Sequence, residues 1–267
     1  MNRREFISSM AAMAQPGASG IRLGCQTRVY GSPLPRREML LNALDDLAAL
    51  GYRGFETNFR SVEHSFKNPA PLRAEFDERR IHLIGLHVSS PADACRMAPV
   101  VRALGGSQAV VSGGKLKGPA AIAKYCDDLN QAGVLCRGLG VQLSMHNHGV
   151  ELENGGFQLR EMLAGTDPAA VTLMLDVGNP FPPEYSVLQI VREHSKRIAG
   201  FHLRDTSAGA EVLMGAGEFD FAGLARAIRE ASWAGWLIVE VNRRADIPSR
   251  KLAEMSLAHI RKTMGNQ

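Results

Sequence analysis

A cluster of imidazole and carboxylate groups lies at residues 143–151, which read Leu-Ser-Met-His-Asn-His-Gly-Val-Glu. If this stretch is an extended strand, side-chain alternation puts His146 and His148 on the same face. The carboxylate of Glu151 follows shortly after them. Imidazoles and carboxylates are common ligands of divalent cations and common acid/base groups. The stretch is therefore a candidate for metal binding or proton transfer, although a buried structural histidine pair would have the same sequence pattern.

Polar residues also end the other apolar segments of the chain. The candidate strand ends carry Gln26, Glu56, His87, Ser112, His146 with His148, Asp176, His202 and Glu240. Each of these side chains, taken singly, has an ordinary structural explanation as a helix cap, a turn residue or a buried hydrogen-bonded histidine. A polar residue at the end of every segment is much harder to explain in this way. The pattern favours one shared site.

The elements that would position these residues alternate between strand-like and helix-like patterns. Predicted strands cover residues 21–26, 53–57, 82–88, 108–112, 141–147, 171–176, 198–203 and 236–241. Predicted helices cover 36–50, part of 62–80, a segment from 91, 119–138, a segment around 159–163, a segment from 183 to about 194, 221–231 and 249–264. This alternation predicts an α/β fold, a single (β/α)8 TIM barrel. Catalytic groups of such barrels lie at the C-terminal ends of the strands, where the polar residues occur.

Composition is that of a globular protein in one domain, which we assign to residues 21–267 because no linker interrupts the pattern. Hydrophobic residues make up 45% and charged residues 22% of the chain. No apolar run is long enough for a membrane helix, so stable membrane association is not expected. The net charge of +4 arises from basic and acidic residues that are spread along the chain, and nucleic acid is not an expected partner. The four cysteines form no CxxC pair and are interpreted as buried or unreactive thiols.

Residues 1–20 have a different character, and we predict that they form an export leader or a disordered tail. Arg3 and Arg4 precede a short, mildly apolar segment, and the Ala-Met-Ala at 12–14 is a candidate cleavage site before Gln15. The two arginines resemble a twin-arginine signal, which exports proteins that have folded around a cofactor. This interpretation predicts a periplasmic or exported protein, and a cytoplasmic one if the segment is only a tail.

Carboxylates and imidazoles from different strands would form a mixed nitrogen and oxygen site for one divalent ion. Mn²⁺ is favoured by the oxygen-rich set, and Mg²⁺, Co²⁺ and Zn²⁺ are alternatives. An ion with open coordination positions can hold neighbouring sugar oxygens and polarise a carbonyl. A nearby carboxylate or imidazole can then move the proton alpha to that carbonyl.

Several motifs together resemble one family. They are His146-Asn147-His148-x-x-Glu151, Leu175-Asp176-Val177-Gly178-Asn179, His202-Leu203-Arg204-Asp205, Gly215-x-Gly217 before Phe219-Asp220-Phe221, and Val239-Glu240. This set resembles the xylose-isomerase-like TIM barrels, a group that includes sugar phosphate isomerases/epimerases and inosose dehydratases. The resemblance covers about residues 21–264. It is specific for the family and unspecific for the substrate.

The resemblance implies a metal held by one group after the fifth strand together with Asp176, His202 and Glu240. Epimerase relatives carry a glutamate at the fifth-strand position, where this chain has His146-Asn147. We take Glu151 as the ligand and His148 as the base, with His146 as the competing ligand. Glu151→Ala is then expected to abolish metal binding, whereas His148→Ala should spare metal binding and remove turnover.

Residue roles implied by the resemblance extend beyond the ligands. Catalytic positions are assigned to His148, Glu240 and Glu151, and substrate-binding positions to Glu56, His87, His146, Asn147, Asn179 and Arg204. Arg204 has an alternative interpretation as a surface arginine paired with Asp205.

These residues are compatible with four functions. The leading interpretation is a metal-dependent sugar or keto-sugar isomerase or epimerase that proceeds through an enediolate, with a small-molecule partner and a homodimer or homotetramer as assembly. The second is a lyase or dehydratase acting on an inosose or a 3-keto-glycoside. An endonuclease acting at abasic sites and a non-catalytic sugar-binding protein are less favoured, the former because the chain lacks the many further ligands that a three-zinc cluster needs.

Overall fold

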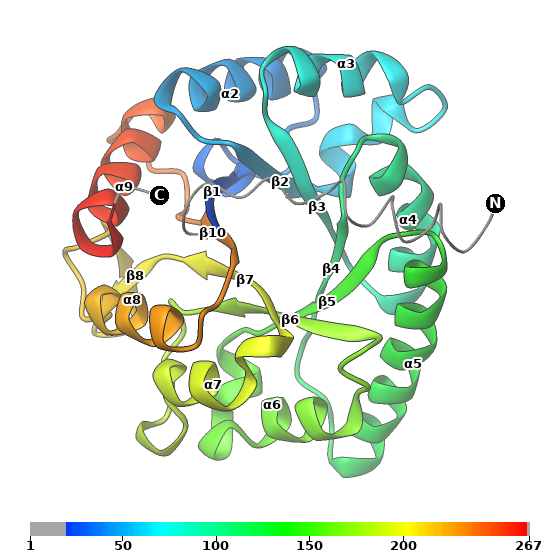
Figure 1. Ribbon diagram of the computed structural model, residues 1–267, viewed down its shortest axis with the longest axis vertical. Coiled ribbons are helices and arrows are strands. Elements are labelled where there is room, and N and C mark those ends of the chain that lie inside the picture. The colour runs from blue at the N-terminus through cyan, green and yellow to red at the C-terminus, as the bar shows by residue number, and fades with distance from the viewer. Residues whose placement is uncertain (1–19, 266–267) are drawn as a thin grey trace.

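Eight parallel strands close into a barrel in the computed structural model, which describes residues 20–265 (Figure 1). The strand order around the barrel is β1-β10-β7-β6-β5-β4-β3-β2. The strands are β1 (Ile21–Gln26), β2 (Gly54–Asn58), β3 (His82–Val88), β4 (Gln108–Ser112), β5 (Gln142–His146), β6 (Val171–Asp176), β7 (Ile198–Leu203) and β10 (Gly235–Val239). The predicted TIM barrel is confirmed, and the predicted strands differ from the observed ones only in β2, β5 and β10, by one or two residues at their ends.

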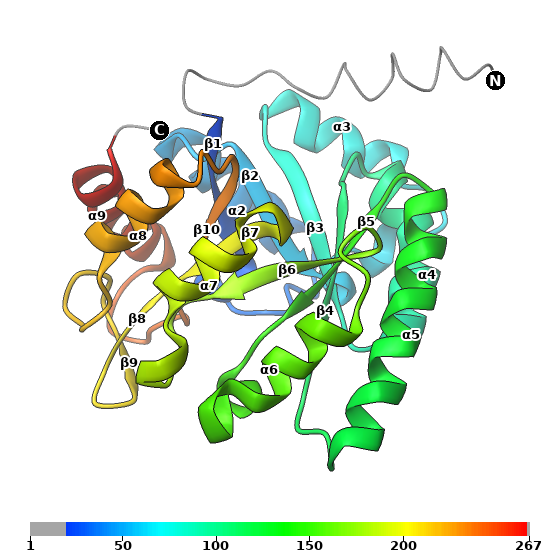
Figure 2. The same cartoon turned by 60° about the horizontal axis from the view of Figure 1, so that its bottom comes forward.

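Helices form a ring around the barrel, as Figures 1 and 2 show. They are α2 (Arg37–Leu50), α3 (Ala70–Glu78), α4 (Pro91–Ala103), α5 (Pro119–Gly138), α6 (Glu153–Gly165), α7 (Val187–His194), α8 (Phe221–Glu230) and α9 (Ser249–Met264). Local sequence sets several of their ends. The Asp220 carboxylate caps α8 by accepting the N–H of Gly223 at 2.7 Å, and α2 stops at Gly51, whose φ of 95° suits glycine.

Side chains alternate between the two faces of each strand. The barrel therefore has an apolar layer on its outside, an apolar layer inside it and a polar layer at its mouth. Outward-facing strand residues pack with the helices in one large core. A separate cluster of buried side chains fills the barrel itself and consists of Ile84, Val110, Met174, Trp236 and Ile238. The next inward-facing residues toward the strand C-terminal ends are polar, for example His146 after Ser144 and Glu240 after Ile238. The apolar layer thus forms a floor under the polar residues at the barrel mouth.

A small hairpin after β7 was not predicted from the sequence. Strands β8 (Asp205–Ser207) and β9 (Ala210–Val212) pair antiparallel outside the barrel. The buried carboxylate of Asp205 accepts the backbone N–H groups of Gly215 at 2.9 Å and Gly217 at 3.0 Å. One side chain therefore fixes the loop that follows the hairpin.

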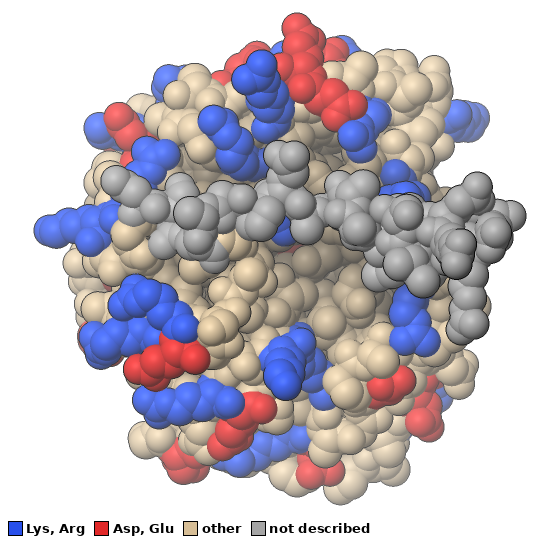
Figure 3. Space-filling view, in the orientation of Figure 1, with Lys and Arg blue, Asp and Glu red and all other residues tan. Residues whose placement is uncertain are grey.

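The surface carries both signs of charge. Lysine and arginine are interspersed with aspartate and glutamate over the outer helices on the face drawn in Figure 3. Between residues 20 and 265, no helix has the length and apolar character needed to cross a membrane. The predicted leader at residues 1–20 falls, except for Gly20, outside the described residues.

His82 predicts a pH dependence of stability at the opposite end of the barrel from the mouth. Its ring stacks on Trp236 with centroids 5.8 Å apart, and the Arg22 guanidinium lies 4.1 Å from the Trp236 ring. Burial, with the charges of Arg22 and Arg73, lowers the pKa of His82 to about 4. Because this pKa lies below the unfolded value of about 6.5, the contribution to stability is complete above pH 6.5 and is lost as the pH falls toward 4.

Urea unfolding at pH 7 and pH 5 measures this effect. His82→Gln is expected to reduce the loss of unfolding free energy between the two pH values by roughly 1 kcal/mol, after allowance for partial solvent screening. An equal loss in the wild type and the variant would show that His82 does not titrate in this way.

Candidate metal centre

Two groups of potential ligands share His202 at the barrel mouth. One consists of His146, His202 and Glu240, and the other of Glu56, His87 and His202. In each group the ligand atoms lie within 4.8 Å of one another, and all five residues are buried. Strands β2, β3, β5 and β7 supply four of them, and Glu240 directly follows β10.

The first group fits a divalent cation. His202 Nδ1 lies 3.1 Å from Glu240 Oε2, and His146 Nε2 lies 3.7 Å from the same oxygen. Although these atoms are close, none of the three has a hydrogen bond of acceptable geometry, and all are shielded from solvent. Buried polar atoms normally have hydrogen-bond partners, so three that converge with only the ion-pair approach of His202 Nδ1 to Glu240 Oε2 between them favour a ligand at this position. Two imidazoles and one carboxylate are also a common catalytic set for Zn²⁺.

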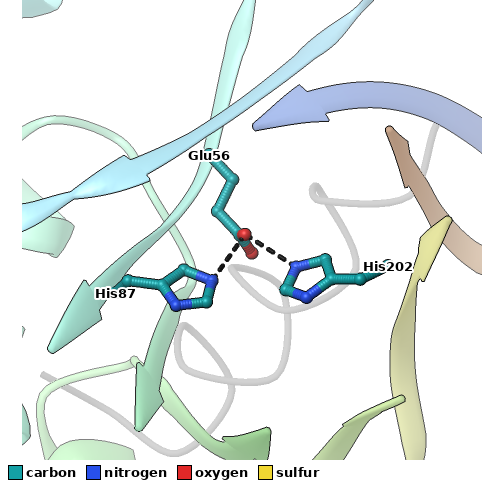
Figure 4. A group of neighbouring side chains, drawn as sticks. All are labelled: Glu56, His87 and His202. Carbon is teal, nitrogen blue, oxygen red and sulfur yellow. Dashed lines mark hydrogen bonds and ion pairs between the residues drawn. The ribbon is translucent and has the colours of Figure 1, made fainter. Parts of the chain in front are cut away.

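The second group orients the first. One carboxylate oxygen of Glu56, Oε1, accepts from His202 Nε2 at 2.7 Å and from His87 Nε2 at 2.8 Å (Figure 4). A proton on His202 Nε2 leaves the Nδ1 lone pair for a cation on the Glu240 side. Carboxylates that hold metal-binding histidines in this way are common around metal sites. Glu56 does not line the mouth cavity described below, and its carboxylate contacts two histidines.

Electrostatics at the mouth favour charged carboxylates. Burial alone would raise the pKa of Glu56, but the charges and hydrogen bonds of His202 and His87 lower it to about 2. Burial opposes ionisation of Glu240 as well, yet His202 and His146 hold its pKa well below the usual range. Burial lowers the pKa of His146 to about 4, against the opposing influence of Glu240. Burial would lower the pKa of His202, but Glu240 and Glu56 raise it well above its usual value. Because a metal ion binds the neutral imidazole, a cation at His202 Nδ1 would displace a proton from this ring.

Asp176 lies next to this group and is held by Arg204. Its Oδ2 is 3.9 Å from His146 Nε2. Arg204 Nη2 donates to that oxygen at 2.6 Å, and the N–H of Gly178 donates to Oδ1 at 2.8 Å. Arg204 therefore pairs with Asp176, whereas Asp205, its alternative partner from the sequence, accepts backbone N–H groups. Asp176 therefore lies beside His146 but belongs to neither ligand group, and it shares its charge with an arginine.

Both predicted asparagines support this arrangement. The side-chain oxygen of Asn147 accepts the backbone N–H of Asp176 at 2.9 Å, and its amide nitrogen donates to the Asp176 carbonyl at 3.0 Å. Asn179 accepts from Arg204 Nη2 at 3.0 Å. Neither asparagine lines the mouth cavity.

Glu151 belongs to neither ligand group. Its Oε2 accepts the backbone N–H of His148 at 2.9 Å and lies 3.9 Å from His148 Nδ1. Its other oxygen is buried without a hydrogen-bond partner and lies against Gly113, where an added Cβ would meet it at 2.4 Å. Glu151 is thus positioned to orient His148, whose ring packs edge-on against that of His146 at 4.7 Å.

A cavity of about 680 Å³ opens above these residues, a volume within the range of small-molecule sites. Predicted residues in its wall are Gln26, His87, Ser112, His146, His148 and Glu240. Sequence reasoning missed others, namely Arg28, Asn58, Ser89, Asn242 and Arg243. Most of these lie one to three residues beyond a strand end, so a search that continued past each last strand residue would have found them.

Fold and sequence comparisons define the class of protein. Residues 44–263 match the family described as "Xylose isomerase-like TIM barrel". Because the match covers most of the chain, this protein belongs to that family, as its motifs predicted.

Particular relatives add detail. An inosose dehydratase of Bacillus licheniformis is 25% identical over 143 residues, which are 45% of this chain and 47% of that protein. The chain thus spans about half the length of the curated relatives it matches. A solved structure described as an IOLI protein with a binding zinc atom has a TM-score of 0.74 at 16% identity and covers 91% of this chain and 98% of its own. An L-ribulose 3-epimerase has a TM-score of 0.73 at 15% identity and covers 91% and 94%. Likeness to solved structures at these identities shows the shared fold.

Proposed function

We propose that this protein is a divalent-metal-dependent isomerase or epimerase that moves a proton alpha to the carbonyl of a sugar or keto-sugar. The observation that carries the proposal is the convergence of three buried ligand atoms of His146, His202 and Glu240, none with a hydrogen bond, below an open polar cavity. The epimerase and inosose dehydratase likenesses support small polyhydroxylated substrates.

The proposed ligands are His146, His202 and Glu240, with Asp176 as the adjacent fourth group. This set takes His146, the competing candidate from the sequence, in place of Glu151. A bound ion would supply a Lewis acid beside the substrate oxygens. The sequence favoured Mn²⁺ on an oxygen-rich ligand set, whereas two imidazoles also suit Zn²⁺, so both ions are candidates.

His148 is the proposed base. It lines the cavity, and 38% of its side chain is exposed to solvent. The Glu151 carboxylate accepts the backbone N–H of His148 and lies 3.9 Å from its Nδ1, which orients the ring. The unprotonated nitrogen of this ring would accept the proton from the substrate carbon. Glu240 and Glu56 remain ionised and keep the neighbouring histidines oriented. The reprotonated product is an isomer or epimer.

A lyase is the second candidate, because the inosose dehydratase relative performs an elimination by its name. Both reactions begin with removal of the same kind of proton. They differ in whether the next step returns a proton to carbon or expels a leaving group from the beta carbon.

Incubation in deuterated water separates the two reactions. The Mn²⁺- or Zn²⁺-loaded protein would be mixed with free ketoses, an inosose and 3-keto-glycosides, and NMR would follow both deuterium uptake and product formation. Deuterium at carbon in an isomer or epimer is the expected result. Loss of water or of an aglycone as the main product would establish the lyase, and tight metal binding without exchange on any substrate would contradict catalysis.

A further inference from the structure

We propose that one wall of the mouth cavity is an anion subsite, formed by Arg243 and Arg28, that binds the carboxylate or phosphate of an acidic sugar. The inference rests on the proposed function for the reaction itself, and it narrows the substrate class to anionic keto-sugars. Binding of the anion, however, is a separate property that does not depend on turnover.

Arg243 is the free cation of this wall. It lines the cavity, and its guanidinium makes no hydrogen bond or ion pair with any side chain of residues 20–265. The adjacent Arg244, by contrast, pairs with Asp246 at 3.1 Å. Although its side chain is exposed, the Arg243 backbone is fixed because its N–H donates to the carbonyl of Arg28 at 2.9 Å. The structure therefore holds an unpaired guanidinium at a defined edge of the cavity.

Arg28 lies beside Arg243, and not all of its guanidinium N–H groups are engaged in hydrogen bonds. Its Nε and Nη2 donate to the side-chain oxygen of Asn242 at 3.1 and 2.7 Å, and its Nη1 lies 3.6 Å from Glu240 Oε1. Asn242 is fixed in turn, since its backbone N–H and its amide group donate to Glu211 at 2.6 and 2.9 Å. This network orders Arg28 before any ligand arrives, which lowers the entropic cost of binding.

The charges around the cavity leave Arg243 without a protein counter-ion. Glu240 is the single acidic residue among those that line the cavity, and it faces His202, His146 and Arg28. Glu211 of the neighbouring hairpin is engaged by Asn242 and lies 3.7 Å from Arg204. A divalent cation at the floor would add further positive charge. The cavity therefore attracts anions, and the planar guanidinium suits two-point binding of carboxylate or phosphate.

The remaining wall suits hydroxyl groups. Gln26, Asn58, Ser89 and Ser112 line the same cavity and are all neutral hydrogen-bonding residues. An acidic sugar would thus place its hydroxyls against this neutral wall, its reacting carbonyl near the floor and its anionic group toward Arg243 and Arg28. With a neutral sugar bound, the guanidinium groups of Arg243 and Arg28 would be solvated by water.

Titration calorimetry with matched sugars tests the subsite. The probes would be pairs of a uronate and its neutral sugar, and pairs of a sugar phosphate and its unphosphorylated form, with the wild type, Arg243→Gln and Arg244→Gln. We expect at least one anionic probe to bind about tenfold or more tightly than its neutral partner, since charge-assisted bonds of this kind are among the stronger ones. Arg243→Gln should remove most of that preference, and Arg244→Gln, the adjacent control, should keep it.

Two results would overturn the inference. One is that no anion in the panel binds more tightly than its neutral partner; the other is that the Arg243 and Arg244 variants have equal preferences. An anion that bound the metal ion alone would give the second result. Preference for the uronates or for the phosphates identifies the anion, and either supports the subsite. Deuterium exchange tests the reaction separately, so anion binding without exchange would contradict the proposed function and leave the subsite standing.

Discussion

His146→Ala is expected to weaken Mn²⁺ and Zn²⁺ binding by about 100-fold or more and to abolish turnover, because it removes one of three converging ligands. Glu151→Gln should bind metal within a few-fold of wild type, since Glu151 instead accepts the N–H of His148 and lies in neither ligand group. Calorimetric titration with each ion, after chelator treatment, measures both. The glutamine keeps an acceptor for the His148 N–H, so a change would reflect the lost charge.

The opposite result would restore Glu151 as the strand-five ligand. His146→Ala leaves a cavity where the buried ring was, but it breaks no hydrogen bond, because neither ring nitrogen of His146 has a partner, so the fold should persist. Far-UV circular dichroism checks this. His148→Ala provides the complementary control: it should bind metal normally and lose proton abstraction, measured by deuterium exchange.

Glu56→Ala is expected to weaken metal binding by about 10- to 100-fold although Glu56 is not a proposed ligand, since partners that orient ligands have effects of this size. Its Oε1 holds the Nε2 atoms of both His202 and His87. Without it, His202 is free to adopt the other tautomer, in which a proton occupies Nδ1 and blocks the metal. Glu56→Gln should have a smaller effect, because the amide oxygen can still accept from the imidazoles but lacks the charge.

Nitrogen NMR of the imidazoles gives a readout that stability alone would not change. The Glu56 variants should shift the His202 signals toward a mixture of tautomers, in parallel with the loss of metal affinity. Glu63→Gln, which alters an exposed carboxylate a few residues away, is the matched control and should change neither quantity. Unchanged affinity and tautomer in Glu56→Ala would limit Glu56 to a structural role.

Sequence reasoning succeeded where the information is local. The alternation of strand-like segments, such as Ile198–Leu203, with helix-like segments predicted the barrel with few errors at strand boundaries. The two-residue repeat of the strands predicted that His202 and Glu240 face inward, because alternation within one strand fixes the face of each side chain. The hairpin at Asp205–Val212 was not predicted, because it consists of two short strands in a glycine-containing loop. The loop that follows it is fixed by the buried Asp205 carboxylate.

Tertiary structure alone decided which atoms meet. Glu56 lies near the C-terminal end of β2, as the sequence indicates, but only the register between strands brings its carboxylate between His87 and His202. Likewise, proximity in the sequence suggested Asp205 as the partner of Arg204, whereas the closed barrel pairs it with Asp176 because β6 and β7 lie side by side. The sequence thus determined the barrel and the set of inward polar groups, since these follow from backbone periodicity. Their pairing, and the identity of the unpaired atoms, required the barrel to close, because contacts between residues far apart in the chain depend on strand register and loop path.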